Sequence, residues 1–305
     1  MPPDFVTRFA PSPTGPLHLG HAYSAILAHD MARAAGGRFL LRIEDIDQVR
    51  CKPEWELAIK DDLNWLGLWW DDDPIRQSDR LPIYQETLDD LWSRELLYPC
   101  TCTRRDIDLA LGAPQEGVML SDGPDGPIYP KTCSPYFRGL PCSMSIRPKD
   151  MNLRLLMGLA AMSSGHHVLN PGHGDWGMWF TETGPAHSGA VITKREDYSS
   201  QIGDIILARK DFCTSYHLSA VLDDAAQGVT HVVRGGDLFK ATRIHVLLQC
   251  LLGLPTPIYH HHRLIRDAAG KRLAKRDDAR ALSKYRAEGA TPGDIRAMVG
   301  LGDGF

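Results

Sequence analysis

Hydrophobic positions at the start of the chain switch between strand-like runs and helical spacing. Residues 5–9 predict a short buried strand, and the Pro- and Gly-rich segment after them predicts a loop that opens a helix. Gly36-Gly37 marks the end of that helix, and residues 39–43 predict a second strand that runs into an acidic corner. This order is typical of the βαβ unit that opens a doubly wound sheet. The apolar positions of the helix are Leu19, Tyr23, Ile26, Leu27, Met31 and Ala34.

The pattern changes twice in the rest of the chain. Two helices are predicted at 53–66 and 81–97, and from 100 to about 195 the Gly- and Pro-rich texture predicts an irregular inserted segment. Regular α/β texture is expected to return at Gln201, and after Pro255 the tail is basic and less regular. The expected elements there are a strand at 204–208, a helix or strand at 216–222, a strand at 229–233 and a helix at 238–252.

Composition narrows the class of protein. The chain has 305 residues, 43% hydrophobic and 24% charged, which is typical of a soluble globular protein. No apolar run approaches the roughly 20 residues of a membrane helix, and the N-terminus lacks an export leader, so a cytoplasmic protein without membrane contact is expected. The net charge of −4 implies that any RNA contact is a local patch. Seven cysteines then indicate thiols or metal ligands, not disulfides.

Two histidines mark the start of the first helix. His18 and His21 are three residues apart and should face one side of a helix N-terminus, where free N–H groups attract anions. Gly15 and Gly20 let a phosphate approach the backbone, and the imidazoles can donate hydrogen bonds to phosphate oxygens during nucleotidyl transfer. In isolation the same motif also fits a capped helix with two surface histidines.

Three sequence blocks carry a family resemblance. RFAPSPTGPLHLGHAYSAIL with FLLRIEDID resembles the opening of glutamyl-tRNA synthetases and of a short paralogous family, the glutamyl-queuosine tRNA(Asp) synthetases. YHLSAVLDDAAQGVTHVVRGGDLFKAT resembles the glutamate-pocket half of the same enzymes, and HHRLIRDAAGKRLAKR resembles their KMSKS region. The resemblance implies a class I synthetase fold: a Rossmann-type doubly wound parallel sheet, interrupted by an inserted zinc-containing subdomain, with a short stem-like C-terminal segment.

The resemblance assigns a glutamate site. Glutamate carries two carboxylates and one ammonium, so guanidinium forks suit the acids and a carboxylate suits the amine. Arg8 and Arg234 fit the first need and Glu44 fits the second, although ordinary ion pairs at strand ends are the alternative. Which arginine binds which carboxylate stays open. The implied glutamate-binding residues are Arg8, Ala10, Ser12, Glu44, Tyr216 and Arg234.

The resemblance also assigns ATP contacts and catalytic residues. Lys275 matches the second lysine of KMSKS and is expected to stabilise charge on the leaving pyrophosphate, with Mg²⁺ arriving on ATP. Arg272 stands at the first lysine and Ala274 replaces the serine, whose hydrogen bond is lost; the alternative is a solvated basic loop. The expected ATP-binding residues are His18, Gly20, His21, Arg272 and Lys275, of which His18, His21 and Lys275 are catalytic.

The inserted segment contains a candidate zinc site. Cys100, Cys102, Tyr129 and Cys133 resemble the zinc ligands of the short paralogues and would form a closed tetrahedral site for one structural Zn²⁺. Tyrosine is an uncommon ligand, so Cys142 or His166 is an alternative fourth ligand. Three reduced, buried cysteines are the alternative without metal.

The resemblance implies four segments and one favoured function. Residues 1–99 and 201–255 are expected to be the halves of the nucleotide-binding catalytic domain, 100–200 the insertion, and 256–305 the KMSKS loop with a short segment and no anticodon-binding domain. The favoured function is ATP-dependent activation of L-glutamate without tRNA, then transfer to queuosine in the anticodon of tRNA(Asp), by a monomer. A glutamyl-tRNA synthetase charging the 3′ end of tRNA(Glu) and an inactive RNA-binding paralogue are the alternatives.

Overall fold

A central sheet combines strands from both ends of the chain. In the computed structural model, β1 (Val6–Phe9) pairs in parallel with β2 (Arg38–Ile43), which pairs in parallel with β3 (Ile75–Arg76). β12 (His231–Gly235) and β13 (Ile258–His262) also pair in parallel. β12 lies beside β1, where Thr230 N donates to Val6 O over 3.0 Å. The order β3-β2-β1-β12-β13 is that of a doubly wound sheet, as predicted. The structure describes residues 4–112, 122–134, 146–164, 168–170, 175–266 and 280–302.

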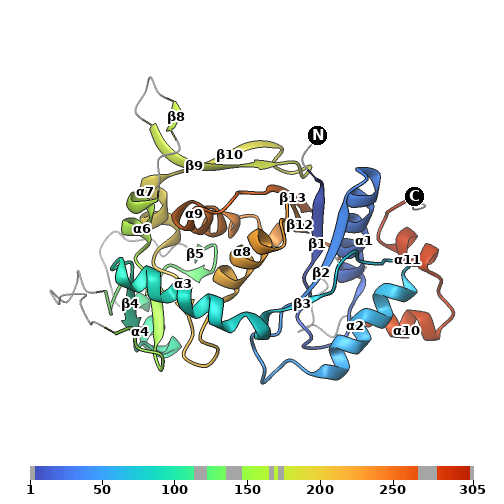
Figure 1. The fold of residues 1–305 in the computed structure, drawn as a ribbon, viewed down its shortest axis with the longest axis horizontal. Coiled ribbons are helices and arrows are strands. Elements are labelled where there is room, and N and C mark those ends of the chain that lie inside the picture. The colour runs from blue at the N-terminus through green and yellow to red at the C-terminus, as the bar shows by residue number, and fades with distance from the viewer. Residues whose placement is uncertain are drawn as a thin grey trace.

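Helices cover both faces of this sheet. The neighbouring residues Val232 and Val233 point to opposite faces, as strand geometry requires, and belong to two separate hydrophobic cores. The first core, around Val232, involves α3 (Leu81–Ser93), α8 (Tyr216–Ala226) and α9 (Thr242–Leu252). The second, around Val233, involves α1 (Leu19–Ala34), α2 (Pro53–Trp65), α10 (Leu282–Ala287) and α11 (Pro292–Met298). Figure 1 shows α1 and α8 on opposite sides of the sheet.

The predicted helix at 81–97 is too long at its end. α3 stops at Ser93, and Glu95 has a φ of 56°, a left-handed conformation that a helix cannot continue through. Leu97 is instead the first residue of β4 (Leu97–Cys100). The apolar residues 96 and 97 continue the helical spacing, which is why the pattern alone extends the helix. The ambiguous segment at 216–222 is helical, as part of α8.

The prediction of an irregular stretch from 100 to about 195 was wrong. β9 (Asp175–Glu182) pairs with β10 (Gly189–Lys194) and adds to the central sheet at β13, where Tyr259 faces Glu182. Short elements separated by Gly and Pro gave too little periodicity to be recognised. The other elements here are α4 (Arg104–Gly112), β5 (Asp122–Gly123), β6 (Gly126–Pro127), β7 (Asn152–Leu155), α6 (Met157–Ser163), β8 (Val168–Asn170) and α7 (Arg195–Asp197).

The basic tail is also more regular than its pattern predicted. β13 follows Pro255, and α11 begins with a capping box in which Thr291 and Asp294 bond each other's backbone. Ile295 of α11 is fully buried against the α1 side of the sheet. The tail needs few apolar residues of its own to form helices, because the sheet and α1 supply the rest of the hydrophobic core.

β4 belongs to a second, smaller sheet of three strands. β4 pairs antiparallel with β7, and β7 pairs antiparallel with β11 (Ile206–Ala208). Tyr98 of β4 donates a hydrogen bond to Asp204 over 2.8 Å, which ties the sheet to the segment before β11. Cys100 is the last residue of β4 and pairs with Asn152 of β7, so this sheet holds its backbone. Within the described residues, no helix is long and apolar enough to cross a membrane.

Asp62 of α2 predicts an unusual pH dependence. It is 5% exposed, and burial, reinforced by Asp61, raises its pKa to about 6. A raised carboxyl pKa means that the folded state holds the proton longer, so stability is lost as pH rises from about 4 to 6. Asp62→Asn is expected to raise the free energy of unfolding at pH 7.5 by about 2–3 kcal/mol.

Urea unfolding of both proteins at pH 4.5 and 7.5 checks this, since the gain should shrink at the lower pH. Asp90→Asn is the matched control, because the Asp90 side chain is 55% exposed on α3 and its removal should change stability by about 0.5 kcal/mol or less. An equal effect of the two substitutions at both pH values would contradict the assignment.

Candidate active site

Nine predicted site residues line one cavity of about 430 Å³. It opens beside the carboxyl ends of β1, β2 and β12, where the N-termini of α1 and α8 approach. Ligands of doubly wound sheets collect at this edge. Arg272 and Lys275 lie outside the described residues, but Ile265 lines the cavity and Ala281 bridges His18, so both flanks of their segment adjoin the site. The nine residues are Arg8, Ala10, Ser12, His18, Gly20, His21, Glu44, Tyr216 and Arg234.

The two histidines stack at the start of α1. Their ring centroids are 3.8 Å apart, and the two residues form a capping box. Gly20 N donates to His18 Nδ1 over 3.1 Å, and His18 N donates to His21 Nδ1 over 3.2 Å. Because a backbone N–H can only donate, both Nδ1 atoms accept, and each neutral ring carries its proton on Nε2. The capped-helix alternative is thus part of the arrangement, and in this tautomer the Nε2–H group of each ring is its donor.

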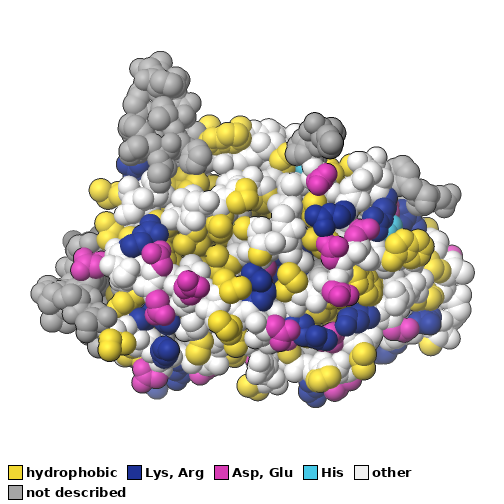
Figure 2. Space-filling model, in the orientation of Figure 1, with side chains coloured by type: hydrophobic (Ala, Val, Ile, Leu, Met, Phe, Trp, Pro, Cys, Tyr) yellow, Lys and Arg dark blue, Asp and Glu magenta, His cyan; other side chains and the backbone are white. Residues whose placement is uncertain are grey.

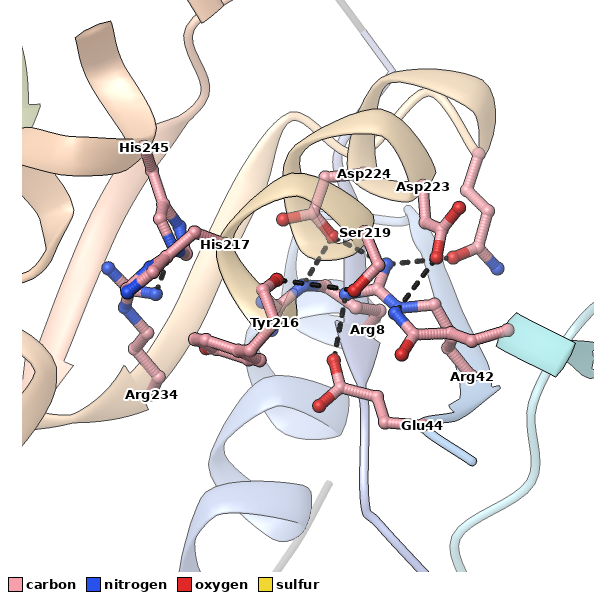
Figure 3. Close-up of polar contacts among 12 residues, drawn as sticks. Arg8, Arg42, Glu44, Tyr216, His217, Ser219, Asp223, Asp224, Arg234 and His245 are labelled. Atoms are coloured by element: carbon pink, nitrogen blue, oxygen red, sulfur yellow. Dashed lines mark hydrogen bonds and ion pairs between the residues drawn. The ribbon is translucent and has the colours of Figure 1, made fainter. Parts of the chain in front are cut away.

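Sheet register brings Arg8 together with Arg42. Arg8 pairs with Leu40 across β1 and β2, and Arg42 is two residues further, so both side chains project to the α8 face. There they meet Asp224: Arg8 Nε donates to its Oδ1 over 2.9 Å, and Arg42 Nη1 to the same atom over 2.6 Å. Arg42 also lies 3.5 Å from Glu44. Figure 3 shows these four side chains converging under α8.

The charged groups in this cluster shift one another's pKa values. Burial opposes ionisation of Asp224, but the adjacent Arg8 and Arg42 outweigh burial and hold the pKa of Asp224 below its ordinary value. Burial raises the pKa of Glu44 above its ordinary value, although Arg42 and Arg8 partly offset the rise. An incoming ammonium beside Glu44 would favour its ionised form, which suits the role expected of it.

Arg234 occupies a different environment. Its side chain is 5% exposed, and its guanidinium contacts His245, His261 and Thr242. Within the described ranges, no carboxylate pairs with it directly. In the view of Figure 3, the half-buried Tyr216 lies between the Arg234 group and the Arg8 group.

Sequence reasoning missed several members of the site. Arg42 is fully buried, and a charged residue inside a predicted buried strand was a usable signal. Asp223 and Asp224 form an acidic pair within an apolar helical segment; Asp223 accepts hydrogen bonds from Gln77, Arg80 and Tyr84. His217 and His245 gave no signal, because nothing in the sequence shows that α8 and α9 place them 3.1 Å apart.

The predicted zinc ligands form a compact cluster. The sulfurs of Cys100, Cys102 and Cys133 lie within 4.8 Å of one another, with Cys102 and Cys133 3.4 Å apart. The Tyr129 hydroxyl is 3.5 Å from the Cys100 sulfur and 3.3 Å from the Cys102 sulfur. Ligands held tetrahedrally at about 2.3 Å from zinc are about 3.8 Å apart, so the donor set fits the metal. Cys142 and His166, the alternative ligands, lie outside the described residues.

A second cavity, of about 930 Å³, separates this cluster from the first cavity. Tyr216 lines both, so the two spaces share a wall. Arg209 and Lys210 are among its cationic residues, and Cys100, Cys102 and Tyr129 border its other side. A ligand in the larger cavity would therefore lie next to a ligand in the first cavity.

The described tail cations are largely engaged. Arg286 pairs with Asp61 over 2.7 Å, Arg280 pairs with Glu288, and Arg263 donates to the Val299 carbonyl. On the face in Figure 2, basic and acidic side chains are interspersed. Several described cations of the tail therefore already take part in contacts within the protein.

Comparison with known proteins supports the fold. The catalytic domain of class I tRNA synthetases (E and Q) matches residues 4–113 and 186–302. A glutamate tRNA ligase from Elizabethkingia meningosepticum, solved in complex with its amino acid, superposes with a TM-score of 0.68 at 25% identity over 97% of this chain. This chain spans 60% of that ligase.

Two curated relatives are similar along nearly their whole length. The glutamyl-Q tRNA(Asp) synthetase of Rhodobacter capsulatus is 62% identical over 97% of this chain and 100% of the relative. That of Thiobacillus denitrificans is 39% identical over 97% of this chain and 85% of the relative. The chain therefore belongs to the glutamyl-Q tRNA(Asp) synthetases, a family built on the class I tRNA synthetase catalytic domain.

Proposed function

We propose that this enzyme activates L-glutamate with ATP to form glutamyl-adenylate, without tRNA, and transfers the glutamyl group to queuosine in the anticodon of tRNA(Asp). The observation that carries the proposal is the single cavity in which the stacked histidines of α1 adjoin Arg8, Glu44 and Arg234. A phosphate-binding helix end thus lies beside residues suited to two carboxylates and one ammonium. The names of the relatives add tRNA(Asp) as the partner.

The chemistry requires alignment and charge stabilisation. An oxygen of the glutamate α-carboxylate attacks the α-phosphorus of ATP, the bond to the bridging oxygen breaks, and pyrophosphate leaves. The Nε2–H groups of His18 and His21 would donate to phosphate oxygens as charge develops, and Gly20 would let the nucleotide approach. Arg272 and Lys275 are assigned to the pyrophosphate side. Mg²⁺ bound to ATP supplies further charge neutralisation.

The same proposal assigns the glutamate contacts. Glu44 would bind the ammonium, and the Tyr216 hydroxyl would hydrogen-bond the substrate. Ala10 and Ser12 would line the backbone side of the cavity beside Arg8. No side chain needs to act as a nucleophile, because the attacking group is the carboxylate of glutamate itself.

We assign one structural Zn²⁺ to Cys100, Cys102, Tyr129 and Cys133. Three sulfurs and a phenolic oxygen within contact distance support a closed site with no open position for substrate. The metal would tie the end of β4 to the segment that follows β6. Residues 100–200 then form the insertion between the catalytic halves at 1–99 and 201–255, with β9 and β10 returning to the central sheet.

The second cavity is the better place for the acceptor nucleoside. It shares Tyr216 with the glutamate cavity and offers Arg209 and Lys210 to the RNA backbone. We assign the anticodon loop to this side, because the acceptor nucleoside would then lie next to the activated glutamate across Tyr216. The enzyme would work as a cytoplasmic monomer, and residues 256–305 would contribute the KMSKS loop.

Transfer of labelled glutamate tests the function. Glutamate-dependent ATP–pyrophosphate exchange is expected without tRNA, and label is expected on tRNA(Asp) that contains queuosine but not on the same tRNA without it. The bond should be an ester to a hydroxyl of the cyclopentenediol ring, labile to mild alkali. Label on the 3′ adenosine of tRNA(Glu), independent of queuosine, would instead make the chain a glutamyl-tRNA synthetase. Absence of exchange and transfer would favour the inactive paralogue.

A further inference from the structure

Arg234 is held by neutral imidazoles, whereas Arg8 and Arg42 are held by a carboxylate. Arg234 Nε lies 3.1 Å from His261 Nε2, and Nη1 lies 3.3 Å from His245 Nδ1. Arg234 and His261 face each other in register across β12 and β13, so their side chains share a face of the sheet. A guanidinium has only donors, so both of these ring nitrogens must be acceptors. This requirement sets the tautomer of each ring.

The ring of His261 in turn donates a hydrogen bond to Glu182. With Nε2 accepting, His261 carries its proton on Nδ1 and donates it to the Glu182 carboxylate. Glu182 is 1% exposed and also accepts from the backbone N–H groups of His261 (2.9 Å) and Gly184 (2.6 Å). Burial opposes its ionisation, but these hydrogen bonds outweigh burial and lower the pKa of Glu182. Burial lowers the pKa of His261, so the ring is neutral.

The ring of His245 in turn donates a hydrogen bond to His217. With Nδ1 accepting from Arg234, His245 carries its proton on Nε2 and donates it to His217 Nδ1 over 3.1 Å. His217 Nε2 then lies 3.6 Å from Asp125, at the second cavity. Burial, with Arg234 adding repulsion, lowers the pKa of His245 well below its ordinary value. Two neutral imidazole rings therefore orient the guanidinium of Arg234. Each ring donates its own N–H group to a residue on the side away from Arg234.

We propose that His245 and His261 are positioning residues that aim Arg234 at a substrate carboxylate while leaving its charge unneutralised. A carboxylate in direct contact would orient the guanidinium equally well, but it would compete with the substrate. Of the two arginines that the described residues contribute to the cavity, Arg8 shares Asp224 with Arg42, whereas Arg234 has no carboxylate in direct contact. This inference rests on the proposed function, because it takes glutamate as the ligand.

Imidazole nitrogen NMR tests the tautomers directly. In protein with ¹⁵N-labelled histidine at pH 7.5, His261 is expected to be protonated on Nδ1 only and His245 on Nε2 only, with signals assigned from His261→Gln and His245→Gln. Either ring in the opposite tautomer, or doubly protonated, would overturn the proposal whether or not any variant retains activity.

Three variants test the consequence for glutamate. His261→Glu places a carboxylate against Arg234 and is expected to weaken equilibrium binding of labelled glutamate by about tenfold or more. His261→Gln keeps a neutral acceptor and should stay within about threefold of wild type. His260→Glu adds the same charge one residue away, where His260 contacts Thr183 and not Arg234, and should leave glutamate binding and the KM for ATP unchanged.

Equal losses in His261→Glu and His261→Gln, or wild-type affinity in His261→Glu, would refute the positioning role. Wild-type protein that binds glutamate but shows no glutamate-dependent exchange would refute the proposed activation step, while the binding comparison would still decide the positioning role. Wild-type protein that does not bind glutamate would refute both.

Discussion

Replacing Asp224 with Asn is expected to lower the free energy of unfolding by about 3–5 kcal/mol and to weaken glutamate binding. Asp224 is 4% exposed and is the shared partner of Arg8 and Arg42. An amide keeps the shape but removes the negative charge, so two buried guanidinium groups lose their partner. Arg8 lines the glutamate cavity, and without its anchor at Nε its orientation there is lost.

The pH dependence of this variant follows from the lowered pKa of Asp224. A carboxylate whose folded pKa is depressed stabilises the protein above its unfolded pKa, and the stabilisation is lost as pH falls through the folded value. The difference between wild type and variant should therefore be full at pH 7 and shrink below about pH 4. Urea unfolding between pH 3 and 7, with equilibrium glutamate binding, measures both effects.

Asp72→Asn is the matched control for charge removal. Asp72 pairs with Arg38 over 2.7 Å, but the two side chains are 55% and 45% exposed. Such a surface pair contributes about 1 kcal/mol or less. If Asp224→Asn were as mild as this control, the proposed role of Asp224 as the charge partner of two buried arginines would be wrong.

Replacing Cys100 with Ser is expected to abolish the proposed zinc binding and to lower the melting temperature by several degrees. Binding energy at a closed structural site is folding energy, so the loss of one thiolate forfeits a large share of it. Cys100 is 2% exposed and also accepts a hydrogen bond from Arg154 Nε at 3.3 Å, so the damage should spread into the β4–β7–β11 sheet. Elemental analysis should find about one zinc per wild-type chain.

Cys250→Ser is the control, because Cys250 is half-buried in α9, away from the cluster. It should retain the metal and cost about 1 kcal/mol. Wild-type protein purified without chelators and found free of metal, or equal melting temperatures for the two variants, would favour three reduced cysteines instead.

Local sequence signals correctly predicted those elements whose start and end depend on residues nearby in the chain. The strand, Pro- and Gly-rich loop and helix around His18 were correct, because the helical spacing and Gly36-Gly37 act within a few residues. The end of α3 was missed, since apolar spacing continues through Leu97 while the backbone at Glu95 does not. The short elements between 100 and 195 were missed because pairing with distant strands stabilises them. Glu182 facing Tyr259 is an example.

The sequence by itself determined the doubly wound opening and the histidines at the start of α1, which follow from residue identity and from spacing along a single element. The residues proposed for the glutamate and zinc sites came from the resemblance to known synthetases. Only the tertiary structure decided that Arg8 and Arg42 share Asp224, that Arg234 is surrounded by His245 and His261, and that Tyr129 lies among the cysteine sulfurs. Each of these contacts joins residues far apart in the chain, so sheet register and helix packing place them. Burial then decides which charges remain available to a substrate.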